Sequence, residues 1–88
     1  MNVLWIKDNN IGHEKQVRVL LEELSKQHKL NIDERYVKGI FPVYSFLSDV
    51  KEKNYDLVVG AGHKTYRLLL NTRKSQKNNC KAIAILAP

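Results

Sequence analysis

Two segments of the sequence combine glycine with histidine at points where a helix is expected to begin. They are residues 8–16, with the sequence DNNIGHEKQ, and residues 60–65, with the sequence GAGHKT. Glycine allows a ligand to approach the backbone closely, and the free N–H groups at a helix start favour a phosphate or another anion. An imidazole can act as a hydrogen-bond partner, general base or general acid near neutral pH. These two loops therefore form the candidate ligand site.

The candidate residues of the two loops divide by role. His13 is the candidate catalytic residue, and the candidate ligand-binding residues are Asn10, Gly12, Gln16, Gly60, Gly62, His63 and Thr65. The same residues also allow interpretations without a ligand. Gly60 and Gly62 are typical of a tight strand-to-helix turn, and each histidine can be a solvent-exposed residue near a helix start.

Other chemistries lack the residues that they need. The three histidines and the single cysteine have no pair at close metal-ligand spacing, so we expect no metal site and no cofactor. The second loop lacks the further glycine of a dinucleotide fingerprint, and the spacing of a Walker loop is absent. A receiver-type phosphorylation site needs acids at the ends of the first and third strands. The third strand ends in glycines, and Asp56 stands at its other end.

Short apolar runs alternate with amphipathic stretches, and this pattern predicts the elements that position the loops. Buried strands are expected at residues 3–7, 55–59 and 81–86, and a half-exposed edge strand at residues 30–38. Apolar residues at helical spacing predict helices at residues 12–28, from Pro42 onward, and at residues 64–77. Trp5 and Tyr55 fall within the expected buried strands, so we expect both in the core.

This alternation of strands and helices predicts a three-layer α/β fold with a four-stranded parallel sheet and helices on both faces. Right-handed crossovers and the edge-like second strand favour the strand order 2-1-3-4. In open α/β sheets, ligands bind outside the carboxyl ends of the strands, where the strand order reverses. The loops after the first and third strands should therefore lie side by side at the carboxyl edge of the sheet.

The length of 88 residues allows one domain, covering residues 1–88. One cysteine permits no internal disulfide, and no stretch approaches the roughly 20 apolar residues that cross a bilayer, so we expect a cytoplasmic protein. The sequence stops where a buried strand would pass into its loop. We therefore expect the N-terminal part of a longer protein. The alternative is a small four-stranded unit that dimerises through its exposed face.

The net charge of +6 has two interpretations. Most basic residues fall where helices face water, and only residues 64–81 are locally basic without a balancing acid. That segment is either a solvated helix face or a face that attracts phosphate. Nucleic acid is the least favoured partner, because aromatic residues are not interleaved with basic ones as a single-strand platform requires.

Three segments carry a resemblance to a known family. Residues 3–6 (VLWI) and 11–16 (IGHEKQ) are similar to a first strand that leads into a Gly-His-x-x-Gln turn. Residues 55–65 (YDLVVGAGHKT) are similar to an Asp-x-x-x-Gly-x-Gly-x-x-Thr segment, and residues 83–88 (IAILAP) to the strand and proline that follow it. With these motifs the chain resembles the mitochondrial-fission "elongated mitochondria" family and its bacterial relatives. Residues 30–54 match in spacing only.

That family in turn resembles the two-domain, GT-B type glycosyltransferases, including the enzyme that adds N-acetylglucosamine to the lipid-linked peptidoglycan precursor. The resemblance implies a Rossmann-like N-terminal domain that handles the acceptor, and a C-terminal domain that holds the nucleotide-sugar donor. His13 maps onto a loop histidine that would accept the proton of the acceptor hydroxyl or stabilise the phosphates of the donor.

The partners implied by the resemblance are a nucleotide sugar, a glycosyl acceptor, including one carried on a peripheral membrane lipid, and the chain's own C-terminal domain. The alternative is a non-catalytic α/β module that binds an anion, a nucleotide or a protein. In that case the two loops position a ligand and transfer no group.

Overall fold

The computed structural model describes residues 1–8, 10–37, 53–76 and 79–85, and the helix expected from Pro42 onward lies outside these residues. The described elements are four strands and two helices: β1 (Asn2–Lys7), α1 (Ile11–Ser25), β2 (Asn31–Tyr36), β3 (Leu57–Ala61), α3 (His63–Ser75) and β4 (Lys81–Ile85). None of the helices in this part of the chain is both long and apolar enough to span a membrane.

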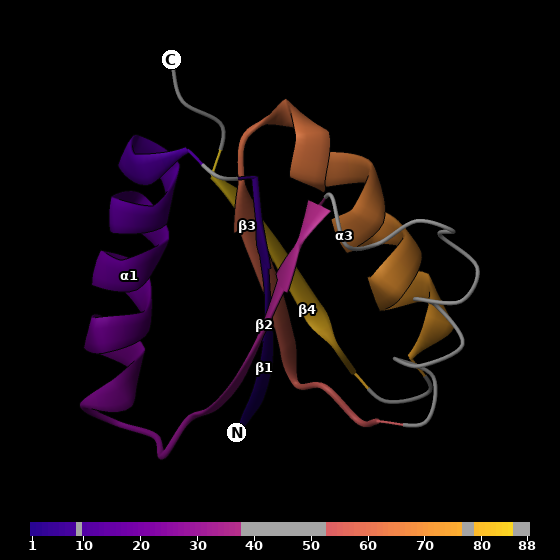
Figure 1. The fold of residues 1–88 in the computed structure, drawn as a ribbon. Coiled ribbons are helices and arrows are strands. Elements are labelled where there is room, and N and C mark those ends of the chain that lie inside the picture. The colour runs from indigo at the N-terminus through magenta and orange to yellow at the C-terminus, as the bar shows by residue number, and fades with distance from the viewer. Residues whose placement is uncertain (9, 38–52, 77–78, 86–88) are drawn as a thin grey trace.

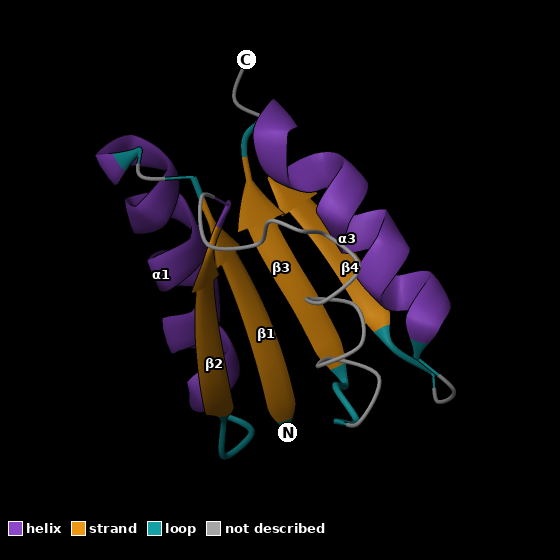
Figure 2. Ribbon diagram, turned by 45° about the vertical axis from the view of Figure 1, so that its right-hand side comes forward, coloured by secondary structure: helices purple, strands orange, loops and turns teal. Residues whose placement is uncertain are grey.

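The four strands form one parallel sheet in the order β2-β1-β3-β4, which confirms the predicted strand order (Figure 2). The two central strands are paired on both sides: Trp5 of β1 lies opposite Glu34 of β2 and opposite Val59 of β3. The sheet stands between α1 on one face and α3 on the other, so the expected three layers are present (Figure 1).

Alternation along the strands divides the core into two clusters. The α3 face contains Leu4, Ile6, Tyr55, Val58, Leu68, Leu69 and Cys80. The α1 face contains Val3, Trp5, Val17, Leu21, Leu57, Val59 and Ala61. The predicted core positions of Trp5 and Tyr55 are confirmed, since both side chains are buried. β2 has no buried residue and lies at the sheet edge, as its polar composition indicates.

Several predicted boundaries were wrong, among them both ends of β3 and the end of α1. β3 does not end before Gly60: the strand begins at Leu57 and continues through Ala61, and Gly60 pairs with Ile6 of β1. Glycine fits inside this strand because a Cβ there would lie 2.9 Å from Thr65 Oγ1 and 3.0 Å from the Ile6 carbonyl oxygen. The first turn of α3 therefore packs directly on the strand backbone.

The end of α1 also differs from its predicted position. The helix ends at Ser25 and does not reach His28, which is exposed. The N–H groups of Lys26 and Gln27 bond to carbonyl oxygens three residues earlier, which tightens the chain into a turn. That turn brings the chain back to the start of β2.

Candidate functional site

The loops after β1 and β3 meet at the carboxyl edge of the sheet, as expected from the strand order. β1 is followed by Asp8, and β3 is followed by Gly62. A Cβ atom built on Gly62 would lie 2.5 Å from Asp8 Oδ2 and 2.8 Å from His13 Nδ1. The backbone of the second loop therefore lies against side chains of the first. This contact is at the point where the strand order reverses, the usual place of a ligand in such sheets.

Asp8 and His13 form a hydrogen-bonded pair at this point. His13 Nδ1 lies 2.7 Å from Asp8 Oδ2, and the other carboxylate oxygen accepts the Asn10 N–H at 3.1 Å. The Asp8 side chain is 8% exposed and the His13 side chain 21%. Because a carboxylate can only accept, Nδ1 carries the ring hydrogen, and Nε2 of the neutral imidazole keeps its lone pair. His13 is thereby oriented as a base or hydrogen-bond acceptor.

The start of α1 fixes the backbone of this histidine. Asn10 is the N-cap of the helix, and its side-chain oxygen accepts the His13 N–H at 3.1 Å. Its carbonyl oxygen accepts the Glu14 N–H at 2.9 Å. Asparagine is among the best N-cap residues because its short side chain satisfies a free N–H of the first turn. The cap and the pair with Asp8 together set the position of the imidazole.

The second loop is a glycine turn held by hydrogen bonds. Gly62 has φ +95°, a conformation that residues with a Cβ rarely adopt. Its N–H donates to the Ile85 carbonyl at the end of β4, and its carbonyl accepts both the N–H and the hydroxyl of Thr65. The Thr65 side chain is fully buried, so its hydroxyl is used within this turn.

The structure brings some of the predicted site residues together and separates others. His13 and Gly62 are in contact, and Asn10 joins them through the cap. Gly60 and Thr65 pack against each other beneath the turn, whereas Gly12 and Gln16 are exposed on α1. His63 is the first residue of α3, and its side chain lies outside the described part of the structure.

Asp8 lies at the start of the first candidate loop, but the sequence pattern assigned it no role in the site. A signal was available. Asp8 directly follows the first buried strand, so it stands at the carboxyl edge where a parallel sheet binds its ligands. Its contact with an imidazole five residues later depends on the helix entry, which the sequence pattern did not resolve.

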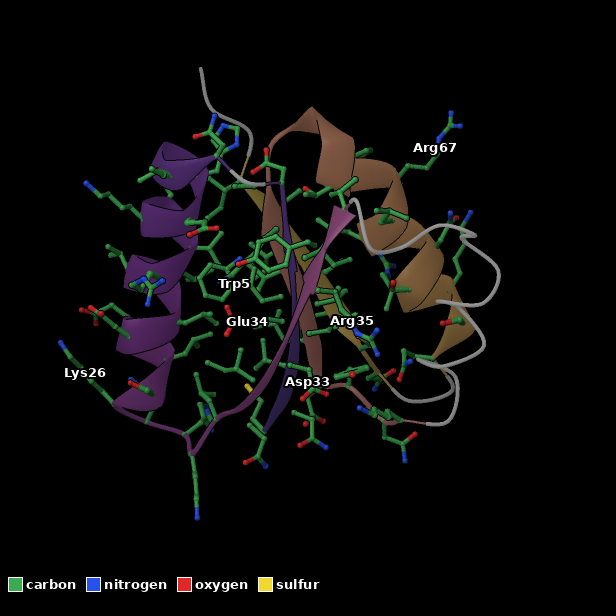
Figure 3. All side chains as sticks on the ribbon, in the orientation of Figure 1. Trp5, Lys26, Asp33, Glu34, Arg35 and Arg67 are labelled. Carbon is green, nitrogen blue, oxygen red and sulfur yellow. The ribbon has the colours of Figure 1, made fainter. Side chains whose placement is uncertain are left out.

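Beside the pair, on the α1 side of the sheet, lies a buried lysine. The Lys7 ammonium pairs with Glu34 of β2 and lies 4.1 Å from the centroid of the Trp5 ring. It also lies 5.5 Å from the centroid of the Tyr36 ring. Figure 3 shows Trp5 and Glu34 on the side of the strands that faces α1. The carboxylate and the two rings compensate this cation, which ties the edge strand β2 to β1.

A second polar cluster lies toward the amino-terminal ends of the strands, away from the loops that follow β1 and β3. The Tyr55 hydroxyl donates to Asp33 Oδ2 at 2.7 Å, and Lys53 Nζ lies 3.4 Å from the same oxygen. The Tyr55 hydrogen bond lowers the pKa of Asp33, and burial raises the pKa of Tyr55 above its usual range. These groups join β2 to the segment before β3, far from the Asp8–His13 pair along the strands.

The described residues offer neither a cluster of metal ligands nor a reactive thiol. No group of three or more His, Cys, Asp and Glu side chains there is arranged to hold a metal ion. Cys80 is buried, and burial raises the pKa of its thiol. A thiol with a raised pKa is a poor nucleophile. The acid–base pair of Asp8 and His13 is therefore the best chemical candidate in the described structure.

The chain matches no protein-family model, no curated protein and no solved structure at a significant level.

Proposed function

We propose that this chain is the acceptor-side, Rossmann-like domain of a GT-B type glycosyltransferase-related protein, with its site at Asp8 and His13. The observation that carries the proposal is the 2.7 Å contact of the buried carboxylate with His13 Nδ1, at the reversal point of the sheet. The resemblance of both loops to the "elongated mitochondria" family supports the same assignment. The wider GT-B architecture rests on that resemblance.

In this proposal His13 acts as a general base. Its Nε2 atom accepts the proton of an acceptor hydroxyl while the hydroxyl oxygen forms a bond to the anomeric carbon of the donor sugar. The bond from that carbon to the nucleoside diphosphate breaks, and the diphosphate leaves with the electron pair. Asp8 keeps the imidazole in the required tautomer and stabilises the imidazolium that forms. A positioned general base of this kind contributes about 10²–10⁴-fold to a rate.

The partners in this proposal follow from the chemistry of the two substrates. The donor is a nucleotide sugar, whose diphosphate the chain's own C-terminal domain would hold. The acceptor carries a free hydroxyl and approaches the carboxyl edge of the sheet, where the Gly62 backbone closes one side of the pair. A lipid-linked acceptor at a membrane surface is consistent with the same arrangement.

A non-catalytic binding module is the second candidate, because several polar groups of the two loops are engaged in holding the loops themselves. The His13 N–H and the Asn10 side chain are engaged in a helix cap, and the Thr65 hydroxyl is engaged in the turn. These groups hold the loops in shape without reacting. In this alternative, Nε2 of His13 only binds an anion or a protein group.

Amide chemical shifts of the ¹⁵N-labelled protein test the proposal. We expect methyl glycosides, which present free hydroxyls as an acceptor does, to shift signals of residues 10–16 and 60–65 in the wild type and in His28→Ala, which changes an exposed histidine outside the site. His13→Ala should lose these shifts. Asp8→Ala should retain the fold and change the ¹⁵N shifts of the His13 ring, because the Nδ1–H tautomer is no longer enforced.

The outcomes separate the two candidates. Shifts that depend on the sugar and vanish in His13→Ala support the acceptor-side domain. Identical shifts with inorganic phosphate alone support the anion-binding module. No shift in either loop with any of the methyl glycosides contradicts the proposed function.

A further inference from the structure

The charge of the chain is divided very unevenly along its length. Residues 1–56 contain nine Lys and Arg and nine Asp and Glu, whereas residues 57–88 contain six Lys and Arg and no acidic residue. The whole net charge of +6 therefore belongs to the part of the chain that forms β3, α3 and β4. Charge scattered evenly over a surface would not have this distribution.

Helix α3 turns its described basic residues away from the sheet. Its inward face consists of buried residues, namely Thr65, Leu68, Leu69 and Thr72. Arg67 and Lys74 are seven residues apart, which is about two helical turns, and both lie opposite that face. Arg73 is exposed on the flank between them and the sheet. Figure 3 shows Arg67 extending from α3 into solvent, on the side of the molecule opposite to Lys26 of α1.

These cations have no acidic partner among the described residues, unlike several cations of the first part of the chain. The ion pairs of Lys7, Lys26 and Lys53 all lie within residues 1–56. None of the described ion pairs includes a residue of α3 or β4. Arg67, Arg73, Lys74 and Lys81 are therefore available to an external anion.

An open groove continues this surface from α3 to β4. It lies between the end of the helix and the start of the strand and is lined by Arg73, Asn79, Cys80, Lys81, Ala82 and Ile83. Lys81 is exposed at the first position of β4. The groove therefore places a strand cation beside a helix cation. We name Arg67, Arg73, Lys74 and Lys81 the basic face.

The composition of this face distinguishes between classes of polyanion. Among the exposed large apolar residues of the described chain, only Tyr66 lies on α3. A stable protein–protein interface needs an apolar core, whereas contact with nucleic-acid phosphates needs positive charge alone. A single tyrosine is also too little for the stacking platform that binds unpaired bases. These features favour the backbone of a duplex over an acidic protein or a single strand.

We propose that the basic face binds the phosphate backbone of double-stranded nucleic acid, without reading its sequence. The site is separate from the Asp8–His13 pair and does not depend on the proposed function. Four cations that each replace a condensed counterion give a slope of about −3.6 for log K against log salt concentration. Binding should not distinguish between duplexes of equal length and different sequence.

The test measures fluorescence anisotropy of a labelled DNA duplex at a series of salt concentrations. Arg67→Glu/Lys74→Glu removes two of the four contacts, so the magnitude of the slope should decrease from about 3.6 to about 1.8 or below, with a loss of affinity at low salt. Lys15→Glu/Lys29→Glu makes the same change in net charge at exposed positions outside the basic face. This control should retain most of the wild-type slope. Arg67→Gln/Lys74→Gln repeats the test without new negative charge near the helix end.

Three results would overturn the proposal. One is a wild-type slope near zero. Another is an equal loss in the basic-face variant and the control, since net charge alone would then explain binding. The third is complete displacement of the duplex by poly-L-glutamate at equal charge concentration, which would assign the face to acidic proteins.

Discussion

Replacement of Gly62 by alanine tests the close approach of the two loops. At φ +95° and ψ 155°, a residue with a Cβ is strained by about 1–3 kcal/mol. The new methyl group would also lie 2.5 Å from Asp8 Oδ2 and 2.9 Å from His13 Cε1, so the pair must separate. Loss of a hydrogen bond to a charged group contributes about 1.5–3 kcal/mol. Together the two effects predict destabilisation by about 4 kcal/mol.

Urea denaturation measures this effect. At an m value of about 1.5 kcal/mol/M, a loss of about 4 kcal/mol lowers the midpoint by about 2.5 M. A domain of this length has a total stability of only about 4–13 kcal/mol, so the variant is best studied in a stabilising buffer such as one with added sulfate. Gly12→Ala is the matched control. A Cβ there would lie 3.3 Å from the Asn10 side chain, and we expect a change of less than about 1 kcal/mol.

The same substitution in a background without the pair separates strain from collision. In Asp8→Ala/His13→Ala, the atoms that the new methyl group would meet are absent. Gly62→Ala should then destabilise by only about 2 kcal/mol, the part due to backbone strain. An equal loss in both backgrounds would refute the contact between the loops, and so would a loss below about 1 kcal/mol in the wild-type background.

Three further substitutions test the surroundings of the site. Tyr55→Phe should destabilise the fold by about 1–2 kcal/mol at neutral pH, because the hydrogen bond to Asp33 is lost. The pKa of Asp33 is lowered in the folded state, so the difference between the two proteins should persist above pH 3.8, the ordinary pKa of the group, and shrink as the pH falls further. Denaturation at several pH values measures this difference. Lys7→Met should change the free energy of unfolding by less than about 1 kcal/mol. Apolar packing often replaces a buried ion pair without loss of stability, and the Glu34 carboxylate left behind is half exposed to water. A loss above about 2 kcal/mol in chemical denaturation would contradict this. Gly60→Ala should lower the thermal midpoint, because the new methyl group would lie 2.9 Å from the buried hydroxyl of Thr65. An unchanged midpoint would contradict this close packing and show that the first turn of α3 can shift.

The strand order could be predicted because the composition of each strand indicates whether it is buried or lies at an edge of the sheet. Val3 and Leu4 belong to a continuous apolar run, which is typical of a strand covered on both faces. The polar composition of β2 marks an edge. The end of β3 could not be predicted, because glycine is typical of turns, and only the folded structure shows Gly60 paired with Ile6 of β1 and packed against Thr65.

The candidate site could be predicted only in part. The meeting of the two loops follows from strand order and from the rule that places ligands at the carboxyl edge. The position of Asp8 beside His13 could not be derived from spacing, because a separation of five positions matches no regular helical or strand period. That contact requires the chain to leave β1, turn at Asn10 and enter α1 in one particular direction.

The Asp8–His13 contact is more than the helix cap requires. Asn10 satisfies the His13 N–H of the first turn by its own side chain, so α1 begins properly without the imidazole. Burial of the Asp8 carboxylate opposes folding, and within the described residues its hydrogen bonds to the His13 ring and the Asn10 N–H offset that penalty. Backbone strain at Gly62 is located at the same point. Two features that oppose stability therefore meet where the strand order reverses, and such a concentration is typical of sites maintained for binding or catalysis.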